Sequence, residues 1–279
     1  MFALPRIVAI DNDEDELKQI QDALVHAHIP CLPIQYDAAT WEAGDLSKLC
    51  IAVRVVLLDL NLLEGAPNAE TITPYIAEVL EAVAPAGPYI IVFWSNHGDL
   101  VDEVLARLAD RYAREVVAPI HHTLLDKKDY RLTGEKAKDE EVAKKLSSKV
   151  EELLHEIPVL EMLADWENRV GIAAASTVSR LYRLAAGDEG WQREKVKSRL
   201  TDLITWIAHE TVGPKTAPDI PGEAIDQGLH HALADELARS AGTRAFNDRW
   251  KAALPEVGNE NFKPSAALVP DALTHKSVI

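Results

Sequence analysis

Short apolar runs separated by amphipathic segments dominate the first half of the chain. Five of these runs have the length and the β-branched, aliphatic content of buried strands. They span Arg6–Ile10, Leu32–Tyr36, Val53–Asp59, Tyr89–Trp94 and Ile120–Leu125. Apolar residues recur at helical spacing between them, in segments that include Leu17–Val25, Trp41–Leu49, Thr71–Val83 and Leu100–Tyr112. This alternation predicts an α/β fold, a doubly wound five-stranded parallel sheet.

After Tyr130 the pattern becomes helical throughout. The charged segment 136–155 carries an apolar stripe and predicts an amphipathic helix that links two halves. Further helices are expected over 158–187, 191–211, 223–238 and 243–254. We therefore expect an α/β domain over residues 1–132 and an all-helical domain over 133–279, with the linking helix at about 135–156.

The charge and the cysteines narrow the class of partner and the compartment. The formal net charge is −16, and the chain up to Tyr130 holds 9 Lys and Arg against 21 Asp and Glu. Such an acidic surface argues against nucleic acid or an anionic membrane as partner. Cys31 and Cys50 fall within or beside predicted buried elements, which is typical of a cytosolic protein. With no signal peptide and no apolar run of membrane-spanning length, the sequence predicts a cytoplasmic protein.

Polar residues follow several predicted strands at the end where ligands bind in open parallel sheets. Asp11, Asn12 and Asp13 come after the first strand, Asp59 after the third, Ser95 after the fourth and Lys127 after the fifth. Because right-handed crossovers bring these strand ends to one rim, we expect the side chains to converge there. The alternative for Asp59 is an aspartate that only caps a loop or the next helix.

The residue types at this rim fit phosphoryl chemistry. Clustered carboxylates without histidine or cysteine suit a hard cation, most plausibly Mg²⁺, with Asp11, Asp13 and Asp59 as the expected ligands. A carboxylate beside such a cation can act as a nucleophile toward phosphorus, and Asp59 is the expected nucleophile. A hydroxyl and an ammonium group, those of Ser95 and Lys127, can stabilise the phosphoryl oxygens.

The stretch Val55-Val56-Leu57-Leu58-Asp59 and the loop that ends at Gly65, together with the strand-end residues, resemble the response-regulator receiver domain over roughly Arg6–Tyr130. The resemblance implies a CheY-like doubly wound fold in which Asp59 is the phosphoacceptor. It implies that Asp11 and either Asn12 or Asp13 hold Mg²⁺. In the same way, Ser95 stands at the switch serine or threonine and Lys127 at the invariant lysine.

The sequence also departs from the receiver pattern. Asn12 stands in the acidic pair unless Asp13 takes that place, and the long segment after Ser95 leaves Lys128 as an alternative to Lys127. The proline expected after the lysine is absent, and Leu124 stands where a switch tyrosine is expected. These departures favour, as the alternative, a pseudo-receiver that acts as a phosphorylation-independent docking module.

The expected function is therefore that of a two-component signalling receiver that passes its state to a helical output domain. Its expected partners are a sensor histidine kinase or another phosphodonor protein, and a second copy bound through the helical region. Ordinary hydrolase activity is not expected, because Asn61 stands where aspartyl hydrolases of this fold carry a second aspartate. A receiver with a helical output is also similar at fold level to regulatory proteins of bacterial anti-phage systems. The alternative docking module could therefore act in such a defence system.

Two features of the second half suggest other chemistry but have simpler explanations. His230 and His231 lie near Asp235, yet a third convergent metal ligand at recognisable spacing is absent from the sequence. The basic residues between Arg193 and Arg199 alternate along a helix rather than sharing one face, so they do not form a DNA-recognition helix.

Overall fold

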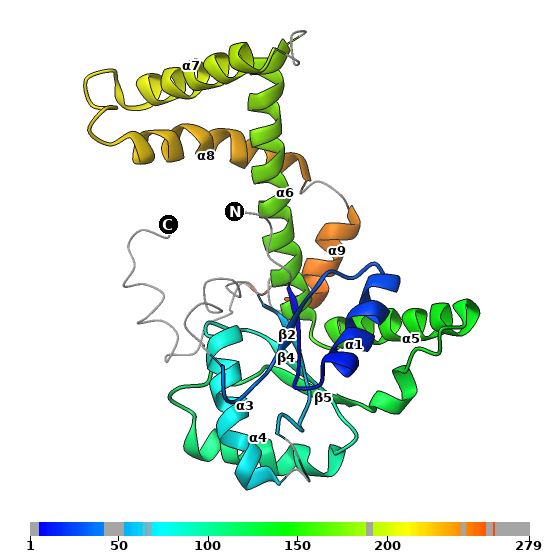
Figure 1. The fold of residues 1–279 in the computed structure, drawn as a ribbon. Helices are drawn as coiled ribbons and strands as arrows, with labels where there is room; N and C mark the ends of the chain where they lie inside the picture. Colours follow the sequence, from blue (N-terminus) through cyan, green and yellow to red (C-terminus); the bar gives the residue numbers. More distant parts are fainter. Residues whose placement is uncertain are drawn as a thin grey trace. The chain divides into compact units, whose positions relative to one another are not determined.

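A parallel five-stranded sheet forms the first part of the computed structural model (Figure 1). The structure describes residues 6–41, 53–63, 65, 68–187, 192–240, 244–254 and 259. The strands are β1 (Ile7–Asp11), β2 (Cys31–Gln35), β3 (Val55–Leu58), β4 (Ile90–Trp94) and β5 (His121–Leu125), in the order β2-β1-β3-β4-β5. All neighbouring strands pair in parallel. The predictions of an α/β class and of five parallel strands are therefore confirmed.

Helices cover both faces of the sheet, as an all-parallel sheet requires. On one face the strand residues Val8, Ile10, Val56, Leu58 and Phe93 share a core with α3 (Ala69–Val83) and α4 (Val101–Arg111). On the other face the alternate strand residues pack with α1 (Glu14–His26) and α5 (Lys136–His155). Because the sheet is buried on both sides, its central strands are continuously apolar, which is the signal that the sequence carried.

Short 3-10 turns complete the connections near the carboxyl ends of two strands. They are η1 (Gly98–Leu100), after β4, and η2 (Lys127–Tyr130), after β5. Asp126 caps η2 by accepting a hydrogen bond from the Lys128 N–H at 2.9 Å. This cap fixes the chain just beyond β5 and so determines where the Lys127 side chain begins. The helix predicted over Trp41–Leu49 lies almost entirely outside the described residues.

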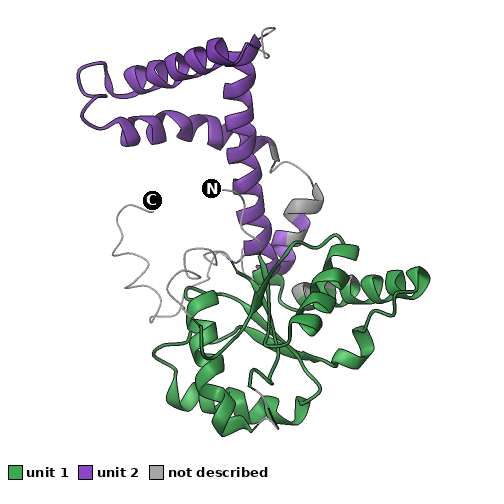
Figure 2. Ribbon diagram, viewed as in Figure 1, with its two compact units in different colours: residues 1–160 green, residues 161–279 purple. Residues whose placement is uncertain are grey.

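The chain divides into two compact units, residues 1–160 and 161–279, later than the predicted boundary at 132/133 (Figure 2). The physical reason is α5. Its apolar residues Leu146, Val150 and Leu153 are buried against the sheet in one core with Leu17 and Ile20 of α1. The predicted helix is present, but it belongs to the α/β unit and is not a linker between two domains.

The second unit is helical, as predicted, and its described elements are α6 (Pro158–Ala186, which starts in the first unit), α7 (Arg193–Val212), α8 (Pro221–Ser240) and α9 (Arg244–Ala253). Helices α7 and α8 run side by side (Figure 1). Gly228 allows their close approach, because a Cβ there would lie 2.4 Å from the Ile207 Cγ2 atom. An ion pair between Arg180 and Glu236, and a hydrogen bond from Arg169 to the Leu237 carbonyl, join α6 to α8.

Candidate functional site

The register of β1 and β3 places two aspartates side by side at the carboxyl end of the sheet. Ile10 pairs with Leu58, so Asp11 and Asp59 follow at the same level. The Asp59 N–H donates to the Ile10 carbonyl at 3.0 Å, which extends the strand pairing up to the site. Both side chains are buried, Asp11 fully and Asp59 with 3% of its surface exposed. Two buried carboxylates at one level require a compensating positive charge.

Lys127 supplies that charge. Its Nζ atom lies 2.8 Å from Asp11 Oδ2 and 3.0 Å from Asp59 Oδ2, and it also forms an ion pair with Glu16. The lysine is itself buried, so water competes little for its ammonium group. One side chain from the segment after β5 thus joins the carboxylates of Asp11 on β1, Glu16 on α1 and Asp59, which directly follows β3. The structure brings the predicted residues Asp11, Asp59 and Lys127 together.

The electrostatic balance of this cluster is visible in two pKa shifts. Burial, followed by the neighbouring charge of Asp59, raises the pKa of Asp11 to about 6, although Lys127 and the Asp13 N–H act in the opposite direction. For Lys127, burial favours loss of the proton, but the charges of Asp59 and Asp11 and the hydrogen bonds outweigh it and raise the pKa. The ammonium form is therefore held firmly, while the carboxylates repel one another.

The acidic residues that follow β1 have different contacts at the start of α1. The Asp13 side chain is the N-cap of the helix and accepts the N–H groups of Asp15 and Glu16, at 2.9 and 3.0 Å. It is exposed, whereas Glu16 on the same turn reaches Lys127. The described carboxylates that could share a metal ion are Asp11, Glu16 and Asp59, whose ligand atoms lie within 4.8 Å of one another. Asp13 as a metal ligand stays a prediction.

Glu16 was not among the residues predicted for the site, yet one feature of the sequence points to it. Asp13 is the N-cap, so Glu16 occupies the third helical position. A glutamate at that position points back toward the residues before the helix. Here those residues include the carboxyl end of β1, and Glu16 consequently lies beside the site.

The remaining predicted residues lie at the same strand ends with other contacts. Ser95 is buried, and its hydroxyl accepts a hydrogen bond from the His97 N–H at 3.3 Å. Its backbone N–H donates to the Leu125 carbonyl. Lys128 is exposed while its neighbour Lys127 is buried, so the geometry favours Lys127 for a role at the rim. Leu124 is 41% exposed on β5 and lies against Gly98.

The acidic cluster has the composition and spacing of a group that could hold a metal ion. Its ligand atoms are carboxylate oxygens, the donors that hard divalent cations prefer. The cluster lies outside the carboxyl ends of β1 and β3, where the crossover direction of a doubly wound sheet reverses and ligands bind. Chemically, the arrangement offers carboxylate oxygens to a cation, beside an ammonium group that these carboxylates already hold.

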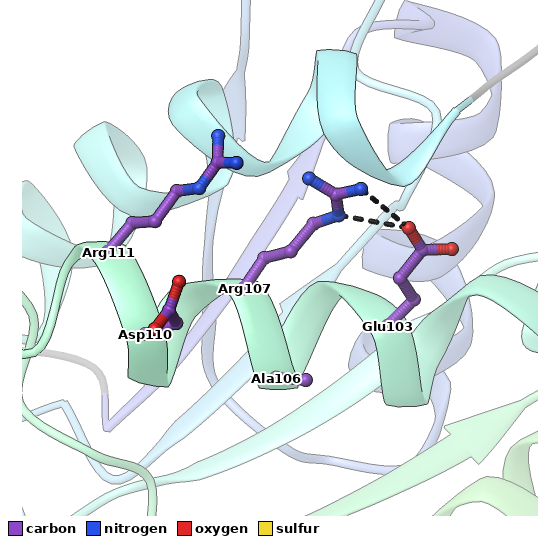
Figure 3. Close-up of a pocket in the computed structure, with 5 residues that line it drawn as sticks. All are labelled: Glu103, Ala106, Arg107, Asp110 and Arg111. Atoms are coloured by element: carbon purple, nitrogen blue, oxygen red, sulfur yellow. Dashed lines mark hydrogen bonds and ion pairs between the residues drawn. The ribbon is translucent and has the colours of Figure 1, made fainter.

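A shallow pocket on α4 is a weaker candidate (Figure 3). It is lined by Glu103, Ala106, Arg107, Asp110 and Arg111, all from one helix. Arg107 and Glu103 form an ion pair at 2.9 Å with i,i+4 spacing, which is a common arrangement on a helix surface. None of the residues of the rim cluster lines this pocket. Its polar groups therefore do not add to the chemistry at the strand ends.

Comparisons with known proteins do not assign the chain to a family. No protein-family model matches the chain, and no curated protein and no solved structure matches it significantly. Within the described residues, no helix combines the length and the apolar character needed to cross a membrane.

Proposed function

We propose that the α/β unit is a receiver that accepts a phosphoryl group on Asp59. The observation that carries this proposal is the ammonium group of Lys127, held between the buried carboxylates of Asp11 and Asp59 at the sheet rim. The strand order β2-β1-β3-β4-β5, which is the flavodoxin-like order of doubly wound sheets, supports it. The resemblance of the Val55–Gly65 stretch to receivers points in the same direction.

The chemistry assigned to Asp59 is nucleophilic attack on phosphorus. One of its carboxylate oxygens forms a bond to the phosphorus of a phosphoimidazole or acyl phosphate donor. The donor leaves with the electron pair of the broken P–N or P–O bond, and an aspartyl phosphate remains. Lys127 lies 3.0 Å from Asp59 Oδ2, and its proposed role is to donate to a phosphoryl oxygen of the product.

A divalent cation would supply the remaining charge compensation. Mg²⁺ takes one or two protein carboxylates together with water and phosphate oxygens, and the buried Asp11 and Asp59 would hold it. When bound, Mg²⁺ offsets the negative charge that an anionic phosphoryl donor brings to the carboxylates. The oxygen-only ligand set of the cluster fits this ion.

The test is phosphorylation of the intact chain. With acetyl phosphate and Mg²⁺, the parent protein is expected to gain the mass of one phosphoryl group, and Asp59→Asn to gain none. Beryllofluoride with Mg²⁺ should raise the Tm of the parent and leave that of Asp59→Asn unchanged. If a correctly folded parent shows neither response, the phosphorylation-independent docking module becomes the better interpretation.

The proposed role of the helical unit is to contact partners, including a second copy of the chain. Its support is a set of large apolar side chains that remain exposed within the unit. Trp166 and Tyr182 on α6 and Trp206 on α7 are 48%, 50% and 59% exposed. Aromatic side chains of this kind are enriched at protein interfaces. A sensor histidine kinase or another phosphodonor protein is the proposed partner of the receiver unit.

A dimer through the helical unit is expected at micromolar concentration. Sedimentation equilibrium should then give twice the mass of the chain, and Trp166→Glu should shift the protein toward monomer, because a buried charge in an apolar interface is costly. Asn168→Glu places the same charge on an exposed position of the same helix and is the matched control. A monomeric parent would refute dimerisation while leaving the partner proposal standing.

A further inference from the structure

The three partners of Lys127 are unequal in how easily they can release it. Asp11 is fully buried, and the side chain of Asp59 is 5% exposed. The side chain of Glu16 is 30% exposed and extends from the first turn of α1. A carboxylate that leaves an ammonium group must be rehydrated or find another donor. Of the three, Glu16 is therefore the one that water can most readily take over.

The donors of Lys127 are also fully used. An ammonium group has three N–H donors and no acceptor. Lys127 donates to Asp11 and Glu16 in hydrogen bonds, and its Nζ lies 3.0 Å from the Asp59 carboxylate. A phosphoryl oxygen on Asp59 would need at least one of these donors. One existing contact must then loosen whenever Lys127 turns toward a phosphoryl group.

From this geometry we propose that Glu16 is a positioning residue that restrains Lys127 and gives up its contact when Asp59 carries a phosphoryl group. The inference rests on the proposed function of Asp59. The restraint sets how readily the site accepts phosphate, because every phosphorylation event has to compete with the ion pair between Glu16 and Lys127. It also links the state of Asp59 to the first turn of α1, which carries Glu16.

Two variants of Glu16 and one matched control isolate the restraint. Glu16→Gln removes the charge, and Glu16→Asp keeps the charge but shortens the side chain by one methylene, so that it no longer reaches Lys127. Glu14→Gln removes an exposed carboxylate from the same helical turn. Within the described residues, the ion-pair partners of Lys127 are Asp11, Glu16 and Asp59, and Glu14 is not among them. Substitutions at Glu14 and Glu16 should leave the Asp13 cap intact, because the Asp13 side chain accepts hydrogen bonds from backbone N–H groups.

The first measurement needs no phosphate. In the NMR spectrum of ¹⁵N-lysine-labelled protein, the Lys127 ammonium group should be visible because its carboxylate partners protect it from exchange with water. The signal is assigned by its loss in Lys127→Met. We expect it to broaden or shift in Glu16→Gln and Glu16→Asp and to stay unchanged in Glu14→Gln. An unchanged signal in both Glu16 variants would overturn the restraint.

The second measurement is the initial rate of phosphorylation by acetyl phosphate at saturating Mg²⁺. Both Glu16 variants should react about two- to fivefold faster than the parent, the size expected for removal of a partly exposed ion pair. The Mg²⁺ concentration for half-maximal rate should not change. If that concentration rises and the rate falls, Glu16 is instead a metal ligand and the proposal is wrong.

Failure of the proposed function would look different. A parent protein that incorporates no phosphate under any of these conditions removes the receiver assignment and with it the effect of Glu16 on phosphorylation. The ammonium signal still decides in that case whether Glu16 holds Lys127. The two results therefore separate the contact from the activity that it is proposed to control.

Discussion

Replacing Lys127 with methionine should lower the free energy of unfolding by about 3–5 kcal/mol in the absence of divalent cations, the cost typical of removing one partner from a buried ion pair. The substitution leaves Asp11, Glu16 and Asp59 within 4.8 Å of one another with no compensating charge. Two of these carboxylates are buried, so water cannot replace the lysine. Methionine has a similar volume, which keeps the packing loss small.

Mg²⁺ should restore much of the stability of Lys127→Met. The ion would occupy the charge-compensating role that the ammonium group has in the parent. Urea unfolding with EDTA and with millimolar Mg²⁺ measures this directly. The increase in stability on adding Mg²⁺ should be larger for Lys127→Met than for the parent, in which Lys127 already neutralises part of the cluster.

Lys128→Met is the matched control for this experiment. Lys128 is adjacent in sequence but exposed, and its substitution should change stability by less than about 1 kcal/mol. The pair of variants also tests the choice between the two lysines. If Lys128→Met proves as destabilising as Lys127→Met, or if Mg²⁺ fails to stabilise the Lys127 variant, the charge balance inferred for the cluster is wrong.

The sheet and most of the rim could be predicted from sequence because each signal is local. Val55–Leu58 is continuously apolar and is followed at once by Asp59, and the structure ends β3 at Leu58. Parallel pairing then brings strand ends together whatever the loops do. The positions of Asp11, Asp59 and Lys127 at one rim follow from this topology alone.

The contact of Glu16 with Lys127 and the packing of α5 on the sheet could not be predicted from the sequence. Glu16 belongs to an acidic run whose first residues suit any helix N-terminus, so charge composition could not separate the cap from the side chain that reaches Lys127. The apolar stripe of α5 could be predicted from the sequence, but a stripe does not indicate which surface of the protein it packs against. Leu146 and Val150 pack on the sheet with α1, a contact between residues far apart in the sequence.

Replacing Asp11 with asparagine should raise stability at neutral pH while removing Mg²⁺-dependent phosphorylation. Burial and the charge of Asp59 raise the pKa of Asp11 to about 6, so its ionised form is unfavourable in the folded protein. The shift from 3.8 to about 6 already includes the attraction of Lys127, and it corresponds to about 3 kcal/mol between the ionised and protonated forms, so we expect a gain of about 1–3 kcal/mol for the neutral amide. An amide oxygen can still accept the Asp13 N–H that Asp11 Oδ1 binds at 2.9 Å.

The pH dependence of this difference has a definite sign. Well below the ordinary value of 3.8 Asp11 is protonated in both the folded and the unfolded parent, and the advantage of Asp11→Asn that comes from the raised pKa should vanish. As the pH rises through the window between the ordinary value of 3.8 and about 6, the folded parent retains a proton that the unfolded chain has lost. The stability contributed by the raised pKa is therefore lost across this window, and the advantage of the variant should grow until it levels off above about pH 6.

Urea unfolding of the parent and Asp11→Asn in EDTA at pH 4, 5, 6 and 7 would measure this change, with Asp15→Asn as the control. Asp15 is an exposed carboxylate on the first turn of α1, and its substitution should change stability by no more than about 1 kcal/mol at any of these pH values. A variant less stable than the parent at pH 7 would mean that the attraction of Asp11 to Lys127 outweighs its burial and its repulsion from Asp59. A stabilised variant that no longer responds to Mg²⁺ would instead show that the carboxylate is kept at the rim at the expense of stability, as is expected when its role is to bind the ion rather than to hold the fold together.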